Sequence, residues 1–255
     1  MDAKKGSKLN HLLQSLPSGI VVLSSWLVDK GYSYDLIRRY KKSNWFTSIG
    51  SGAIIRTGDN VGYEGAVYAL QRQGGLKVHI GGRTALSLLG RAHYLDFDAR
   101  KVFLFCESGS KLPAWFLNND WGYKIETVNT SFLPPEMGLT SIDQKSFTIQ
   151  IANPERAIME CLYLSQRVHS LLECYELMEG LNNLRPKEVQ KLLENCNSVK
   201  VKRLFLFMAE KANHQWLNYV SIDNIDLGNG KRSFSKEKGV YDPKYQISLP
   251  EDLIK

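Results

Sequence analysis

Residues 33–44, SYDLIRRYKKSN, combine apolar positions that need a core with cations that attract an anion. On a helical wheel, Leu36, Ile37 and Tyr40 gather on one side, while Asp35 and the basic residues take the opposite side and its flanks. One face can therefore pack on other helices while the other enters the major groove of DNA, as a recognition helix requires. The side chains that we expect to contact DNA from this helix are Ser33, Tyr34, Arg38, Arg39, Lys41 and Lys42.

Arginine and lysine are well suited to binding nucleic acid. Arginine can pair with guanine O6 and N7 or with phosphate, and lysine pairs mainly with phosphate. Arg56 on an expected wing, and Lys4, Lys5 and Lys8 on an expected first helix, are predicted to hold flanking phosphates. The alternatives to DNA are an RNA partner, a protein partner, or an ordinary amphipathic surface helix that binds nothing.

The rest of the sequence offers little catalytic chemistry. It contains no HExxH, GxSxG or P-loop pattern, and its histidines are scattered with no pair at metal-ligand spacing. Cys106 and Cys161 sit in apolar segments, which is typical of core thiols. Asp96 and Asp98 are interpreted as strand-edge or turn residues. We therefore expect no enzyme activity, no metal and no cofactor.

A glycine pair, Gly81-Gly82, precedes an expected helix start near Thr84. Backbone amides at a helix N-terminus can bind an anion. The segment lacks the glycine, lysine and hydroxyl spacing of a nucleotide-binding loop. A tight strand-to-helix turn is the favoured interpretation.

Three helices and a hairpin are expected to position the basic helix. Pro17 ends the first helix, Gly31 breaks the second, and Ser33 caps the third. A flexible turn at residues 49–52 joins two strands. This order predicts a winged helix-turn-helix. The expected helices span residues 4–15, 19–29 and 34–43, and the expected strands span 45–49 and 53–56.

The remaining chain predicts a mixed α/β body, so the fold class is α+β. Asn153 is an expected N-cap, with Pro154 at the first helical position. We expect a winged helix-turn-helix domain at residues 1–95 and a C-terminal domain at residues 96–255. Expected strands lie within 76–95 and at 101–107, 123–133 and 146–152, with two more in a C-terminal tail. Expected helices lie at 61–73, 112–118, 154–165, 168–179, 186–195 and 199–212, and a further helix is expected to start near Thr84 within 76–95.

The net charge of +7 is unevenly distributed. Residues 1–100 hold 14 Lys and Arg against 7 Asp and Glu, whereas residues 101–255 hold 19 of each. This asymmetry suggests a polyanion-binding front module on a neutral body, with a solvated basic surface as the alternative. The longest aliphatic run, residues 20–23, is too short to span a membrane. Four cysteines without a CxxC pair are interpreted as reduced thiols, which predicts a cytoplasmic protein.

Several segments, taken together and in order, resemble the AbiEi family of antitoxins from bacterial type IV toxin–antitoxin systems, which act in abortive infection. The segments GGRTAL and NPERAIMECL are the most telling, because no generic fold requires them. The others are SYDLIRRYKKSNWFTSIGSGAIIRTG, GYEGAVYALQRQ, VKVKRLFLFMAEKANHQWLNYV and the tail from IDLGNGKRSF to YQISLP.

The resemblance implies an N-terminal winged helix-turn-helix and a C-terminal domain that gives antitoxicity. It implies that the protein binds inverted repeats in its own promoter and represses the operon. It also implies that the protein counters a nucleotidyltransferase toxin without a stable complex. A monomer in solution with two copies per operator is compatible with DNA symmetry. The family supplies no catalytic residues.

A basic patch would be needed if the neutral C-terminal domain also contacts DNA or gives antitoxicity. The candidates are Lys200, Lys202, Arg203 and Lys211 on one helix, or Lys231 and Arg232. A solvated face is the alternative reading of these cations. Two other functions stay open for the whole chain: an enzyme that acts on the toxin or on nucleotides, and a stand-alone transcriptional regulator that senses a ligand.

Overall fold

The protein is described by a computed structural model, which covers residues 3–91, 100–235 and 239–254, with side chains from residue 8 onward. The mixture of helices and sheets confirms the α+β class. Two compact units are assembled from separate chain segments, so the predicted division after residue 95 stays a prediction. Unit 1 comprises Met1–Val78, Ser110–Lys124 and Ser141–Gln150, and unit 2 comprises His79–Gly109, Ile125–Thr140 and Ile151–Lys255.

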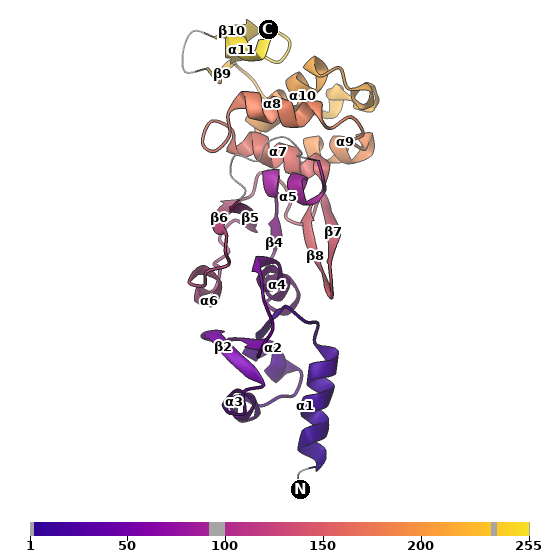
Figure 1. Ribbon diagram of the computed structural model, residues 1–255. Coiled ribbons are helices and arrows are strands. Elements are labelled where there is room, and N and C mark those ends of the chain that lie inside the picture. The colour runs from indigo at the N-terminus through magenta and orange to yellow at the C-terminus, as the bar shows by residue number, and fades with distance from the viewer. Residues whose placement is uncertain (1–2, 92–99, 236–238, 255) are drawn as a thin grey trace. The chain divides into compact units, whose positions relative to one another are not determined.

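Unit 1 contains the predicted winged helix-turn-helix (Figure 1). Its elements are, in order, α1 (Ala3–Ser15), β1 (Val21–Leu23), α2 (Ser24–Asp29), α3 (Tyr34–Lys42), β2 (Phe46–Gly50) and β3 (Ala53–Arg56). The three strands form an antiparallel sheet with the order β1-β3-β2. The hairpin of β2 and β3 is the wing, and α3 is the helix that the basic residues predicted.

The predicted second helix, residues 19–29, is wrong at its start. Val21 pairs with Ile55 and Leu23 pairs with Ala53, so this segment is a strand at the edge of the wing sheet. Its three residues are all buried. Valine favours strands because its branched side chain packs well on a pleated surface. The helix therefore begins only at Ser24.

A compact apolar core holds α3 in place. Leu12 of α1, Leu27 of α2 and Ile37 of α3 are each 2% exposed or less. The turn between α2 and α3 passes through Gly31, whose φ of +86° is a conformation that residues with a side chain rarely adopt. Ser33 then caps α3 by accepting a hydrogen bond from the backbone N–H of Leu36 at 3.3 Å, as predicted.

Unit 1 contains further helical segments beyond the winged helix-turn-helix. The helix predicted at 61–73 is present as α4 (Tyr63–Tyr68), followed by a π-helical segment over Ala69–Gln73. The helix predicted at 112–118 is present as α6 (Ala114–Leu117).

The second strand predicted within 76–95, together with Asp96 and Asp98, falls on or beside residues 92–99, which lie outside the described residues.

A five-stranded sheet has the order β6-β5-β4-β8-β7. Four of its strands were predicted, with β5 matching the expected bounds. The additional strand β7 was missed because its alternation of polar and apolar residues is weak. The strands are β4 (Val78–Ile80), β5 (Lys101–Glu107), β6 (Lys124–Thr130), β7 (Leu139–Gln144) and β8 (Phe147–Ala152).

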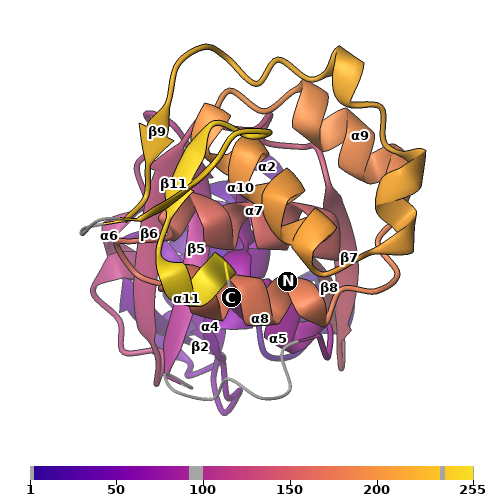
Figure 2. The same ribbon diagram turned by 90° about the horizontal axis from the view of Figure 1, so that it is seen from above.

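Helices α7 (Pro154–Leu164), α8 (Leu171–Glu179) and α10 (Val199–Lys211) pack on one another within unit 2 (Figure 1 and Figure 2). Asn153 caps α7 as predicted, since its side chain accepts from the Arg156 N–H at 2.8 Å. The other helices of unit 2 are α5 (Gly82–Leu88), α9 (Pro186–Glu194) and α11 (Glu251–Ile254). A small sheet has the order β10-β11-β9, formed by β9 (Arg232–Ser233), β10 (Val240–Asp242) and β11 (Ile247–Leu249).

Candidate nucleic-acid interface

The outward face of α3 brings together four of the predicted contact residues. Ile37 and Tyr40 are buried and fasten the helix to the core. Tyr34, at the start of the helix, is 63% exposed. The basic side chains split by position: Arg38, Arg39 and Lys42 are exposed, and Lys41 is half-buried. The hydroxyl oxygen of Ser33 accepts the helix-cap hydrogen bond, and its predicted contact with DNA stays a prediction.

An acidic residue lies on the same face. The carboxylate of Asp35 accepts a hydrogen bond from the guanidinium of Arg38, with Nη2 and Oδ1 2.5 Å apart. Both side chains are largely exposed, Arg38 at 67% and Asp35 at 71%. The sequence pattern placed Asp35 on this side of the helix, but its pairing with Arg38 was not predicted.

One predicted cation of α1, Lys8, contacts the turn that precedes α3. The amino group of Lys8 donates to the backbone carbonyl of Gly31 at 3.2 Å and lies 5.6 Å from the centre of the Tyr32 ring. Lys8 is exposed and therefore stands beside the turn between α2 and α3. Lys4 and Lys5 lie on α1, and their side chains fall outside the described ones.

Arg56 is half-buried, and part of its guanidinium is held by α1. Its Nη2 donates to the carbonyls of Leu13 and Leu16, at 2.7 and 2.9 Å. Both carbonyls lie at the end of the first helix. Helix C-termini leave such carbonyls without intrahelical partners, so a guanidinium there satisfies two of them. Arg56 thus fastens the wing strand to α1, and its predicted role as a DNA contact stays a prediction.

The wing is braced by a segment that lies far downstream in the chain. The side-chain amide of Asn119 donates to the carbonyl of Ile49 in the wing and to that of Trp115, each at 2.6 Å. At Gly50, an added Cβ would lie 2.7 Å from the Cβ of Trp115, closer than such atoms ever approach. The glycine therefore lets the wing strand pass directly over Trp115. Sequence reasoning assigned Gly50 to a turn and had no signal for this contact.

The exposed hydroxyls of the wing complete the candidate interface. Thr47, Ser48 and Ser51 are exposed along β2 and at the tip of the hairpin. Hydroxyls and backbone amides bind sugar and phosphate groups without carrying sequence information. Residues 46–55 contain no charged side chain, and Arg56 is engaged with α1. Residues 46–55 of the wing therefore offer only neutral groups to a phosphate backbone.

The predicted C-terminal basic patch is not a surface patch. Arg203 is 1% exposed and donates to four backbone carbonyls, at Leu227, Gly228, Gly230 and Gln246. Lys202 is also buried, at 4% exposed. Their burial corrects the prediction, because a helix whose two neighbouring cations are packed inside presents no continuous basic face.

The other two members of that predicted patch are also held by the fold. The amino group of Lys200 donates to the carbonyls of Tyr163 and Ser165, at the end of α7. Lys211 donates to the carbonyl of Ile254 and lies over the ring of Tyr175. The alternative pair, Lys231 and Arg232, is exposed and stays a candidate.

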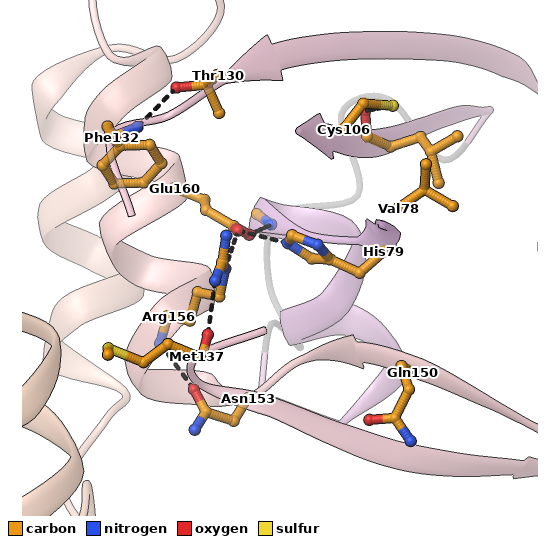
Figure 3. Close-up of polar contacts among 12 residues, drawn as sticks. Val78, His79, Cys106, Thr130, Phe132, Met137, Gln150, Asn153, Arg156 and Glu160 are labelled. Carbon is orange, nitrogen blue, oxygen red and sulfur yellow. Dashed lines mark hydrogen bonds and ion pairs between the residues drawn. The ribbon is translucent and has the colours of Figure 1, made fainter. Parts of the chain in front are cut away.

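The glycine pair, Gly81-Gly82, forms a tight turn whose backbone N–H binds a carboxylate of the protein itself. The carboxylate of Glu160 accepts from the Gly82 N–H at 2.8 Å, from Nε2 of His79 at 2.7 Å and from Nε of Arg156 at 2.7 Å. Figure 3 shows His79 and Arg156 converging on Glu160. A Cβ at Gly81 would lie 2.1 Å from Oε2 of Glu160, so a side chain there is excluded.

This cluster is buried and polar, and its protonation follows from its contacts. Burial alone would raise the pKa of the Glu160 carboxyl, but attraction to His79 and Arg156 and their hydrogen bonds outweigh burial and lower it. Burial lowers the pKa of His79 more than Glu160 raises it. The ionised Glu160 therefore balances Arg156, while burial disfavours the charged form of His79. The two most telling sequence segments, GGRTAL and NPERAIMECL, meet at this structural cluster.

Other chemistry-bearing residues are accounted for by packing. Cys106 and Cys161 are buried, as predicted, and burial raises the pKa of Cys106 to about 11. Within residues 3–91, 100–235 and 239–254, no group of three or more His, Cys, Asp or Glu residues is arranged to hold a metal. Over the same residues, no helix is both long enough and apolar enough to cross a membrane.

Two protein-family models together match nearly the whole chain. Residues 5–97 match the model described as the AbiEi antitoxin N-terminal domain of transcriptional regulators. Residues 99–250 match the model described as a transcriptional regulator, AbiEi antitoxin, of a type IV TA system. No curated protein matches the sequence.

The fold is similar to the crystal structure of the RV2827C protein from Mycobacterium tuberculosis. The two chains are 12% identical, and the match covers 98% of this chain and 94% of that one, with a TM-score of 0.56. At this identity the likeness concerns the fold alone.

Proposed function

This chain belongs to the AbiEi antitoxin family of transcriptional regulators from type IV toxin–antitoxin systems, and on that premise we propose that it binds double-stranded DNA in the bacterial cytoplasm. The proposed target is a pair of inverted repeats in the promoter of its own operon, which it represses. The observation that carries the proposal is α3, which is anchored by Ile37 and Tyr40 and presents Arg38, Arg39 and Lys42 to solvent.

The proposed binding mode follows from the winged helix-turn-helix. The first residues of α3 reach base edges in the major groove, and the cations farther along hold phosphates. The wing contacts the adjacent backbone through its exposed hydroxyls. Two protein molecules bind the two halves of an inverted repeat, because the symmetry of the site requires two identical contacts.

The proposed partner in the cell is a nucleotidyltransferase toxin encoded next to this protein. The protein counteracts the toxin without a stable complex between them. Antitoxicity belongs to the C-terminal region, which family resemblance separates from the DNA-binding front. DNA binding and toxin neutralisation are therefore expected to be separable by mutation.

The first test removes two cations from the outward face of α3. Replacing Arg38 and Arg39 by alanine should abolish selective binding to the upstream DNA, measured by fluorescence anisotropy, because it removes two of the proposed DNA contacts. The fold should be kept, because both side chains are exposed and contribute no packing. The thermal unfolding midpoint should be unchanged. The same double variant should still protect cells that express the adjacent toxin gene, measured as growth.

A matched control removes the same charge elsewhere. Lys187 and Lys191 are two exposed cations on α9, and their double alanine variant should bind the upstream DNA as the wild type does. Undiminished DNA binding by the Arg38 and Arg39 variant would contradict the proposed recognition helix. Failure of the folded variant to protect cells would contradict the separation of the two activities.

A further inference from the structure

The outward face of α3 contains one residue of the wrong sign for DNA. Asp35 is 71% exposed and lies among the cations proposed to meet the phosphates. A carboxylate near a polyanion is repelled, so Asp35 should weaken binding unless it has a compensating role. Ser33 already caps the helix, so the cap does not require it. Its position in the first turn does suit the positive end of the helix dipole.

The contact between Asp35 and Arg38 suggests such a role. One guanidinium nitrogen, Nη2, meets one carboxylate oxygen, Oδ1, at 2.5 Å. Within the described part of the chain, the remaining N–H groups of Arg38 and the second oxygen of Asp35 make no other hydrogen bond. The pair therefore presents donors and an acceptor side by side, both exposed to solvent.

This arrangement matches the major-groove edge of a G·C base pair. Guanine offers two acceptors there, N7 and O6, and cytosine offers one donor, its N4 amino group. Resting on the proposed DNA-binding function, we infer that Asp35 and Arg38 act as one unit that reads a G·C pair. Arg38 donates to guanine, and Asp35 both orients Arg38 and accepts from cytosine.

Orientation before binding is the physical advantage of the pair. A free arginine side chain has many rotamers, and fixing one of them on binding costs conformational entropy. An arginine already held by a neighbouring carboxylate loses less freedom when it meets guanine. Selectivity for one base pair then rises, although the carboxylate lowers attraction to DNA of any sequence.

The experiment uses the full-length protein and a library of random duplexes. Selection with the wild type gives a preferred half-site, and anisotropy then measures binding to that duplex, to single base-pair changes in it and to a scrambled duplex. The variants are Asp35→Ala, Asp35→Asn and Arg38→Ala. Asp29→Ala is the control, because Asp29 is an exposed carboxylate at the end of α2.

We expect one G·C pair whose change to A·T weakens wild-type binding by roughly ten- to a hundredfold. Arg38→Ala should remove that preference. Asp35→Ala and Asp35→Asn should reduce it at the same base pair, while binding of the scrambled duplex stays equal or becomes tighter. This difference between the selected and the scrambled duplex distinguishes base reading from a helix-stabilising role, which would weaken binding to all duplexes alike.

The inference is overturned if both Asp35 variants keep the wild-type base preference, or if they lose affinity for selected and scrambled duplexes by the same factor. A wild type that selects no sequence would overturn the proposed function itself. A wild type that selects a half-site without a G·C dependence on Arg38 would overturn the inference while leaving the proposed function intact.

Discussion

Single residues show where a pattern of cations in the sequence succeeds and where it fails. Helical periodicity predicts the buried face of α3 correctly, because Ile37 and Tyr40 pack in a core built mainly from residues 12–54 of the same unit. It fails for α10, because Arg203 is buried by carbonyls from residues 227–246. No local pattern records such distant partners, so the burial of Arg203 could not be predicted from the sequence.

Glu160 gives the clearest prediction at this scale. Replacing it by glutamine removes the negative charge that balances Arg156, which is 2% exposed. A buried charge left without its partner costs about 3–5 kcal/mol. We therefore expect Glu160→Gln to lower the free energy of unfolding by that amount, measured by urea denaturation at neutral pH. Glu176→Gln, an exposed position on α8, should change it little.

The pH dependence of stability provides the second readout of the same variant. The lowered pKa of Glu160 means that its contribution is present above the ordinary carboxyl pKa and is lost as the pH falls through the folded value. The lowered pKa of His79 adds a loss at higher pH, below the ordinary imidazole pKa, in the wild type and in the variant alike. Below the ordinary carboxyl pKa, wild-type stability should therefore fall more steeply than that of Glu160→Gln, and parallel curves over that range would contradict the ionised cluster.

Secondary-structure elements were predictable where local sequence decides them. The bounds of β3 and β5 match the predictions, and α3 differs by one residue at its end. β1 was predicted as helix because its apolar residues fit either period, and pairing with β3 decided the outcome. The brace on the wing had no sequence signal, because Asn119 and Gly50 are far apart in the chain.

The wing brace leads to a prediction about Gly50. An alanine there would collide with Trp115 and should lower the free energy of unfolding by about 1–3 kcal/mol. It should also weaken binding to the upstream DNA, because the wing is displaced while α3 is unchanged. Gly52→Ala is the matched control, since a Cβ there meets nothing within 4 Å although φ is +78°. Equal effects of the two variants on binding would contradict the brace.

At the scale of the whole molecule, the sequence shows where the positive charge lies but not which segments build the front module. The excess of +7 in residues 1–100 agrees with a cationic α3 on a winged helix-turn-helix. The segment Ser110–Lys124 lies beyond the family range 5–97, yet it packs in unit 1 against the wing. The front module therefore depends on residues that a division of the chain after residue 95 would remove.

The central claim is that the exposed face of α3 binds the upstream DNA of the operon. The most direct measurement is fluorescence anisotropy of the full-length wild type with that DNA and with a scrambled duplex, over a series of salt concentrations. If each monomer neutralises about five phosphates, binding should be selective, with a log–log salt slope of about −4 to −5 per monomer. Equal affinity for both duplexes, or binding that ignores salt, would contradict the claim.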